Sequence, residues 1–182
     1  PNDIVTFIQP NGPQNNGCMR IDCGENNVWV ARGALSSSWN NQWAAAEIYN
    51  FTGEQWFSLT AVNSPKLSGR KDICFVKVNP KNSKQAYFGS YGGGLIEVNN
   101  GKVIEVYDDN NSPLQNIIPG SPFVRVTGLD FDKDGNLWTI NSEVQNNLTV
   151  RKPDGSWKSI SLTNAMGGIK ITGELYCTSD GI

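Results

Sequence analysis

Histidine is absent from this 182-residue sequence. The chain therefore has no residues for a Ser-His-Asp triad, a Cys-His dyad or a histidine-ligated zinc site of its own. Charge is also scarce: 18% of the residues are charged, and 15 basic residues against 17 acidic ones leave a net charge of −2. Such a balance argues against strong electrostatic attraction to nucleic acid or to anionic membranes. We therefore predict no nucleic-acid partner.

Long apolar runs are missing too. A membrane-spanning helix needs about 20 consecutive apolar residues, and no stretch of this sequence approaches that length. We predict no transmembrane segment in this chain. Pro1 is not a natural translation start, so we expect a processed or trimmed N-terminus, which leaves room for an export signal upstream.

Cysteine is sparse, and its four copies lack the spacing of the common metal and redox motifs. Cys18, Cys23, Cys74 and Cys177 include no Cys-x-x-Cys pair, which excludes the usual zinc-binding and thioredoxin-like patterns. Four cysteines allow three disulfide pairings. The sequence leaves open whether they are free thiols or form structural disulfides.

Turn-forming and aromatic residues, in contrast, are plentiful. The chain holds 22 asparagines, 19 glycines and 9 prolines, together with 6 Trp, 5 Tyr and 7 Phe. Asparagine and glycine tolerate positive φ and so favour tight turns. This composition predicts short strands connected by many turns, and it disfavours long helices.

A short turn motif recurs along the chain. The pattern Asn-[Gly/Ser]-Pro occurs at residues 11–13, 63–65 and 111–113, with starts 52 and 48 residues apart. Asn164 marks a fourth copy without the proline. Each copy follows an apolar, strand-like run. A repeat of this length is typical of proteins built from similar units stacked side by side.

A second marker keeps step with the first. An aromatic residue stands in a short apolar run after a tight turn at Trp29, Tyr87, Trp138 and Tyr176. Aromatic residues at equivalent positions of successive units are expected to pack between the units. Trp56 and Trp157, which begin later runs, are also expected to pack at the core or its edge.

Each complete unit is predicted to contain four strands, because Asn-Gly, Asp-Gly and related turns are strong hairpin signals. The expected strands are 19–22, 28–31, 46–50 and 55–59 in the first unit, 74–78, 86–90, 94–98 and 103–107 in the second, and 127–131, 137–141, 148–151 and 157–162 in the third. Antiparallel four-stranded units of about 40–50 residues are typical of β-propeller blades.

The predicted fold class is therefore all-β: a single β-propeller, or a fragment of one, over residues 1–182. The full blades are expected over about 18–60, 73–108 and 125–163, and partial blades over 1–10 and 168–182. Since a free-standing propeller needs about four to eight blades, we expect part of a longer propeller. The alternative is a four-bladed ring closed by pairing of the two partial ends.

Two stretches carry a resemblance to a known repeat class. Residues 128–142 (GLDFDKDGNLWTINS) and 86–114 (AYFGSYGGGLIEVNNGKVIEVYDDNNSPL) resemble the two-component regulator propeller repeat, with its D-x-x-G-N-L-W turn and its Gly-rich break between strands. The order of whole blades resembles the N-terminal propeller of the PorZ family. This is the surface component of the type IX secretion system of Bacteroidetes.

The resemblance implies a binding or scaffold module, exported to the periplasm or the outer-membrane surface. It implies protein partners in a secretion and attachment complex and recognition of lipopolysaccharide or another glycan. The same repeats also occur in the periplasmic half of hybrid two-component histidine kinases. A ligand-sensing propeller that binds glycan fragments is therefore the alternative.

The candidate ligand-binding residues are Trp39, Trp43 and Arg32. Both tryptophans lie in a polar loop, SSSWNNQW, where aromatic faces beside Asn and Gln suit sugar recognition. The competing interpretation is that each ring covers the core beneath its own loop. Arg32, together with Arg20, Arg70 and Arg125, is a candidate for a basic patch that meets an anionic polysaccharide.

Two further motifs are assigned structural roles. Asp130, Asp132 and Asp134 match the start of an EF-hand loop, but Asn141 stands where the bidentate Glu belongs. A hairpin turn is favoured there over calcium, and no metal or other cofactor is predicted. The glycines at 92–94 precede no Lys-Ser or Lys-Thr pair, so a strand break is favoured over a phosphate cradle.

No set of nucleophile, base and oxyanion donors is visible in the sequence. We therefore expect no enzymatic activity. The open alternative is a glycosidase-like or lyase-like propeller, which would need clustered acidic side chains at one mouth of the channel.

Overall fold

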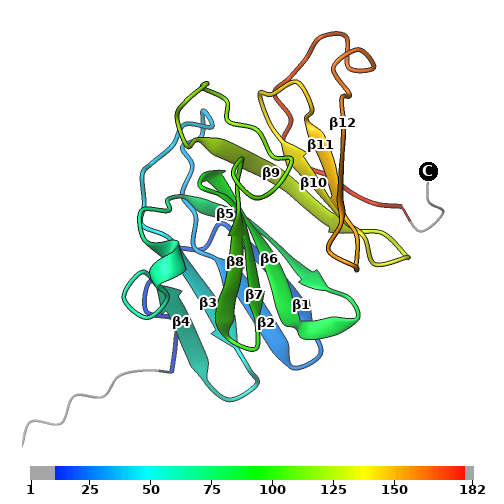
Figure 1. Ribbon diagram of the computed structural model, residues 1–182. Helices are drawn as coiled ribbons and strands as arrows, with labels where there is room; N and C mark the ends of the chain where they lie inside the picture. Colours follow the sequence, from blue (N-terminus) through cyan, green and yellow to red (C-terminus); the bar gives the residue numbers. More distant parts are fainter. Residues whose placement is uncertain (1–10, 179–182) are drawn as a thin grey trace, which may run out of the picture.

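The computed structural model describes residues 11–178 (Figure 1). Within these residues, twelve strands follow one another in three groups of four, which we call the first, second and third units. The first unit comprises β1 (Arg20–Gly24), β2 (Asn27–Ala31), β3 (Glu47–Phe51) and β4 (Trp56–Thr60). The second comprises β5 (Ile73–Asn79), β6 (Asn82–Gly92), β7 (Gly94–Asn99) and β8 (Lys102–Tyr107). The third comprises β9 (Val124–Phe131), β10 (Leu137–Asn141), β11 (Leu148–Arg151) and β12 (Trp157–Ile160).

Within each unit, strands that are neighbours in sequence pair antiparallel. A single turn of 3-10 helix, η1 (Pro65–Leu67), is the only helical element assigned between residues 11 and 178. The all-β prediction is confirmed, and each of the twelve expected strands is present with its ends shifted by a few residues. The hairpin signals act as expected: in the β7–β8 turn, Asn100 and Gly101 take φ values of 48° and 69°, as a turn with two positive-φ residues requires.

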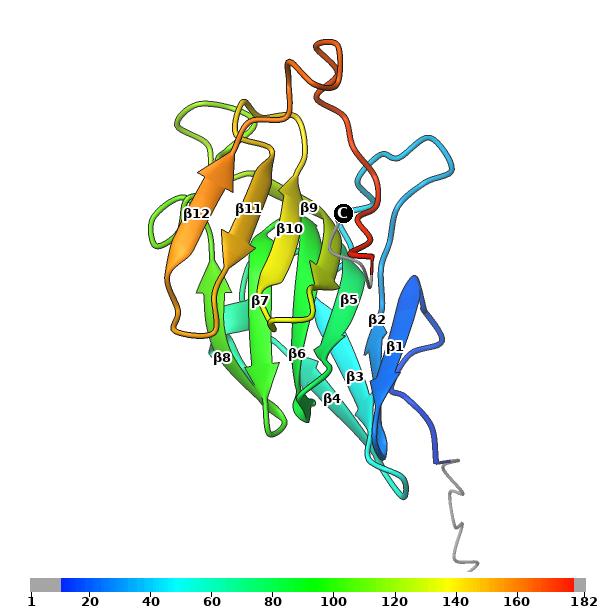
Figure 2. The same ribbon diagram turned by 90° about the vertical axis from the view of Figure 1, so that its right-hand side faces the viewer.

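The three units lie side by side with their first strands innermost. Contacts join β1 to β5 and β5 to β9, while the last strands of the units diverge outward (Figures 1 and 2). At one end, β6 also pairs with β9 through Tyr91 and Gly92, which links the second and third units. Curled antiparallel sheets in this arrangement fit part of a β-propeller.

Two hydrophobic cores fill the spaces between successive units. The first core gathers Trp29, Ile48 and Leu59 of the first unit against Phe88 and Ile96 of the second. Trp29 and Phe88 meet edge to face with ring centroids 6.0 Å apart.

The second core lies between the second and third units, where Phe75, Tyr87 and Leu95 meet Val126 and Leu137. The packing expected of Trp29 and Tyr87 is therefore observed: both are buried at the boundary of their own unit.

The recurring Asn-Ser-Pro turn has an identifiable structural role. In the first unit, the Asn63 side chain accepts from the Thr60 N–H at 2.9 Å and donates to the Ser58 carbonyl at 2.8 Å. The Asn111 side chain makes the same pair of bonds at the same spacing in the second unit, at 3.0 Å each, with the backbone of residues 108 and 106. Each asparagine thus satisfies backbone groups at the end of the last strand of its unit.

The glycines at 92–94 form the predicted break between β6 and β7. A Cβ on Gly94, which has φ of +85°, would collide with the carbonyl oxygen of Tyr107. The Ser90 hydroxyl accepts from the Gly93 N–H at 2.6 Å. The backbone amide at this break is therefore engaged within the sheet, in agreement with a structural role.

The C-terminal segment differs from expectation. No strand forms over residues 168–178, although the segment runs beside β9 (Figure 2). It is held there by bonds from Thr127 Oγ1 to the Thr172 carbonyl, 2.7 Å, and from the Cys177 N–H to Asp130 Oδ2, 2.7 Å. Tyr176, expected to pack between units, is 77% exposed, since no further unit within 11–178 covers it. The partial blade expected over 1–10 lies outside the described residues.

Candidate functional site

The loop that carries both candidate tryptophans is shaped by the second unit. This tryptophan loop, residues 33–45, connects β2 to β3 and projects past the ends of the strands (Figures 1 and 2). Isolated bridges pair Leu35 with Asn41 and Ala45 with Lys71. The first bridge closes the loop on itself, and the second ties it to the segment that leads into β5.

Asp72 is the anchor of the tryptophan loop. This residue is fully buried, and its carboxylate accepts three hydrogen bonds from the loop. The donors are the Ala44 N–H at 2.8 Å, the Asn41 amide at 2.9 Å and the Trp43 N–H at 3.1 Å. Hydrogen bonds to an ionised acceptor are stronger than neutral ones, so one carboxylate sets the path of the loop.

Trp39 and Trp43 both have a φ of 59°. A bulky residue in this region is an outlier, because its Cβ crowds the following carbonyl. Strained backbone of this kind persists only where its surroundings impose it, and it concentrates at functional sites. Trp43 is 61% exposed and Trp39 43% exposed. The loop therefore holds two large aromatic side chains partly in solvent at a conformational cost.

The two tryptophan rings differ in how much of their surface packs against the protein. Trp39 lies near parallel to Phe75, with centroids 6.5 Å apart, and reaches Tyr91 at the same distance. Trp43 meets Phe123 of the third unit edge to face at 5.8 Å. Trp39 thus partly fulfils the competing prediction of a ring packed under its loop, whereas Trp43 presents most of its surface.

Arg125 on β9 joins the tryptophan loop to the third unit. Its guanidinium lies 4.4 Å from the Tyr91 ring centroid and 5.2 Å from that of Phe123. It pairs with Glu143 and donates to Asn41 Oδ1 at 3.3 Å. Burial raises the pKa of the Tyr91 hydroxyl, against the opposing effect of the neighbouring guanidinium. Asp72 and Phe123 are thus parts of this site that no local sequence signal indicated, and Arg125 was considered only for the basic patch.

Arg32, the third candidate residue, faces other partners. Its Nε lies 3.6 Å from a Glu47 oxygen, and its Nη1 donates to the Ala45 carbonyl at 3.3 Å. Tyr49 also donates to Glu47. Among residues 11–178 the polar contacts of Arg32 therefore go to this carboxylate and to the loop backbone, and neither tryptophan ring is among them. A ligand role for Arg32 stays a prediction.

The arginines considered for a basic patch all have acidic partners. Each pairs with a carboxylate of its own, in the pairs Arg20–Glu174, Arg32–Glu47, Arg70–Asp108 and Arg125–Glu143. Their charges are compensated locally. A basic patch for an anionic polysaccharide stays a prediction.

The acidic motif at 130–134 forms the favoured hairpin. The Asp132 carboxylate accepts from the backbone N–H groups of Asp134 and Asn136, and from the Asn136 amide and Trp138 Nε1, at 2.8–3.0 Å. Burial acts to raise the pKa of Asp132, but these hydrogen bonds outweigh it and hold the pKa below its usual value. Asp130 instead pairs with Lys77 at 2.9 Å.

All four cysteines are free thiols: Cys74 is buried, Cys177 half-buried, and Cys18 and Cys23 exposed. Burial, together with the charge of Asp72, raises the pKa of Cys74 to about 12. Residues 11–178 contain no group of three or more Cys, Asp or Glu side chains placed to hold a metal ion. No helix in that range has the length and apolar character needed to cross a membrane.

Comparison with known proteins identifies relatives in structure only. No protein-family model and no curated sequence matches the chain. Its fold is similar to that of PorZ, an essential surface component of the type IX secretion system of Porphyromonas gingivalis, with a TM-score of 0.83 and 22% identity. The match covers 97% of this chain and 24% of PorZ. The chain thus spans about a quarter of that protein.

Two further structures share the fold less closely. The extracellular domain of a hybrid two-component system of B. thetaiotaomicron matches with a TM-score of 0.52 and 16% identity, over 96% of this chain and 26% of that one. A protein described as a 6-phosphogluconolactonase from Bacteroides uniformis matches with a TM-score of 0.55 and 14% identity, over 88% and 47%. At these identities the likeness is one of fold.

Proposed function

We propose that this chain is a non-enzymatic, propeller-type binding module of an exported bacterial surface protein, and that its tryptophan loop recognises glycans. The observation that carries the proposal is the pair Trp39 and Trp43, which have positive φ and are partly exposed. The buried Asp72 holds their loop through Asn41, Trp43 and Ala44. Aromatic faces stack on the apolar faces of sugars, while amide side chains such as Gln42 bond the hydroxyls. The similarity to PorZ supports this setting at the level of fold.

The assignment as a propeller is part of the proposal. We infer that the three units are blades of a ring longer than this chain, since the match to PorZ covers 24% of that protein. Light scattering of the purified chain tests it. A monomeric mass would favour the four-bladed alternative. Self-association would favour an incomplete ring, because exposed strand edges pair between chains.

We also propose that the chain has no enzymatic activity. Without histidine, acid–base catalysis would need other groups such as carboxylates, and the adjacent carboxylates of Asp108 and Asp109 are engaged in contacts within the protein. Asp108 bonds Arg70 at 3.1 Å and Asn110 at 3.0 Å, and Asp109 accepts from Asn116 at 2.6 Å. The lactonase-like neighbour shares the fold at 14% identity. Turnover of any member of a glycan or lactone panel would refute this part.

The glycan proposal is tested with a panel of neutral and acidic bacterial oligosaccharides and purified lipopolysaccharides. We expect at least one binder whose affinity falls on the order of tenfold or more in Trp43→Ala, because a stacking face is lost. Ile21→Ala is the matched control, since Ile21 and Trp43 are equally exposed, at 61%, and Ile21 lies on β1, outside the tryptophan loop. Equal binding by wild type and Trp43→Ala would exclude the loop as the site.

A second candidate function is supported by the similarity to the extracellular domain of a hybrid two-component system. In that case the module would sense a glycan fragment and signal through downstream domains. The remainder of the gene separates the two. A transmembrane helix followed by kinase domains supports the sensor, and a second propeller with a small C-terminal domain supports the secretion role.

A further inference from the structure

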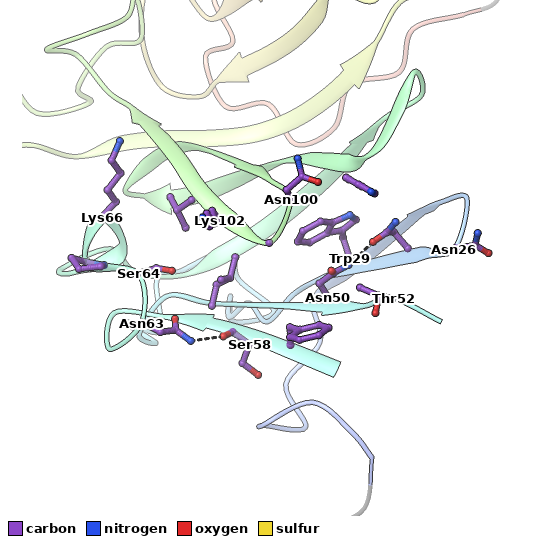
Figure 3. Close-up of a pocket in the computed structure, with 17 residues that line it drawn as sticks. Asn26, Trp29, Asn50, Thr52, Ser58, Asn63, Ser64, Lys66, Asn100 and Lys102 are labelled. Carbon is purple, nitrogen blue, oxygen red and sulfur yellow. Dashed lines mark hydrogen bonds between the residues drawn. The ribbon is translucent and has the colours of Figure 1, made fainter. Parts of the chain in front are cut away.

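A groove lies between the first and second units, on a part of the surface unrelated to the tryptophan loop (Figure 3). Its volume is about 1080 Å³, which is at the upper end of the range for ligand sites. The groove exists because the inner strands of the two units pack closely, while β4 and β8 diverge at the outer side. Buried core residues, Trp29 and Leu59, form part of its wall.

The charge of this groove is one-sided. Lys66, Lys84 and Lys102 line it, and none of its lining residues is acidic, although the whole chain carries more acidic than basic residues. Lys66 is partly compensated, because its ammonium donates to the Ile104 carbonyl and lies 3.4 Å from Glu105. The ammonium groups of Lys84 and Lys102 make no ion pair with residues 11–178. Two lysines without an ion-pair partner among residues 11–178 therefore line one concave surface.

The amides in the groove are mostly committed to the protein. Asn50 donates to Asn27 and to the Val28 carbonyl, and Asn27 donates to Ser83. Asn63 holds the end of β4, as described above, and its bond to Ser58 is drawn in Figure 3. The amides of Asn27, Asn50 and Asn63 are therefore already engaged.

Apolar surface makes up the rest of the wall. Phe57 is 49% exposed, and Pro65 and Val103 line the same groove. An apolar wall with a few placed polar groups is the usual composition of a site for an organic ligand. The two kinds of feature together select a ligand that has both an anionic group and an apolar body.

We propose that this groove binds an organic anion with an aromatic or aliphatic body, whose charged group lies against Lys84 and Lys102 and whose body lies against Phe57. A purely inorganic anion would lack the apolar contact. A neutral apolar molecule would lack the ion pairing. The site is independent of the glycan proposal, because it shares no residue with the tryptophan loop.

The test uses two fluorescent probes of the same shape, anilinonaphthalene sulfonate and its uncharged parent anilinonaphthalene. We expect the sulfonate to bind wild type at one site, and the double variant Lys84→Gln/Lys102→Gln to weaken it on the order of tenfold. The uncharged probe should be unaffected by the lysine changes. Phe57→Ser should weaken both probes. Sodium sulfate alone should compete only at high concentration.

Matched controls separate the groove from general effects. Lys133→Gln/Lys158→Gln removes the same charge from exposed positions outside the groove, and Trp43→Ala alters the other candidate site; neither should change sulfonate binding. Urea midpoints and circular dichroism establish that every variant is folded. The proposal is overturned if the lysine double variant binds the sulfonate as wild type does, if both controls weaken it equally, or if wild type does not bind it.

Discussion

Asp72 offers the sharpest test of how the candidate site is held in place. The substitution Asp72→Asn keeps the shape of the side chain and its tolerance of the left-handed backbone, which has φ of 48° here. If the amide oxygen keeps the bond from the Ala44 N–H, the new NH₂ group replaces Oδ2. In the wild type, Oδ2 accepts from the Asn41 amide and from the Trp43 N–H. In the variant these two donors would meet an NH₂ group, which cannot accept their hydrogen bonds.

The magnitude follows from those two lost bonds. A hydrogen bond to a charged group contributes about 1.5–3 kcal/mol, which gives about 3–6 kcal/mol for the pair. The Trp43 side of the loop is open to water, which can accept one of the two hydrogen bonds in place of the carboxylate. We therefore expect the free energy of unfolding to fall by about 2–4 kcal/mol. For a chain of this length that corresponds to a lower Tm by about 4–16 °C.

Urea unfolding followed by tryptophan fluorescence measures the change. We expect a lower midpoint with an unchanged m-value, because the surface exposed on unfolding stays the same. Any glycan bound through the tryptophan loop should also be lost. Asp134→Asn, an exposed residue of the β9–β10 hairpin, is the control and should change stability by less than about 0.5 kcal/mol. An equally small effect for Asp72→Asn would refute the anchoring role.

Three further predictions concern the fold. Asn63→Ala and Asn111→Ala should each cost about 1–2 kcal/mol, since each removes two bonds to strand-end backbone; urea midpoints equal to wild type would show that water replaces them. Phe88→Ala, in the fully buried first core, should cost about 3–5 kcal/mol, and a loss under about 1 kcal/mol would contradict the packing described. The pKa of Asp132 is depressed in the folded state, so its contribution is present above its usual value of 3.8 and is lost as pH falls through the lower folded value. Asp132→Asn should therefore flatten the decline of stability below about pH 4, and an unchanged acid profile would argue against it.

Strand positions were accessible from the sequence because turn chemistry is local. A pair such as Asn100-Gly101 specifies a hairpin through its own backbone preferences. The apolar runs on either side of it are thereby brought together as paired strands. The same locality explains the spacing of the Asn-Ser-Pro motif. Asn63 and Asn111 bond backbone groups three and five residues before them, so the repeat marks the end of each last strand directly.

The candidate site was accessible only in part. Composition singled out Trp39 and Trp43, because exposed aromatic residues in a polar loop are chemically conspicuous. The residues that contact their loop are far away in sequence. Asp72 lies 29 residues after Trp43, and Phe123 and Arg125 lie at the start of the third unit. Nothing in their own neighbourhoods distinguishes them from ordinary strand-end residues.

The sequence by itself determined the all-β class, the twelve strands and the turns between them, since each depends on the preferences of a few adjacent residues. Only the tertiary structure decided which arginines were compensated, which aromatic faces stayed exposed, and where uncompensated lysines met apolar surface. Ion pairing and burial depend on groups brought together from separate units. Arg32 illustrates the difference. In the sequence it is a cation next to a candidate loop with no visible partner, whereas in the folded chain it is paired with Glu47.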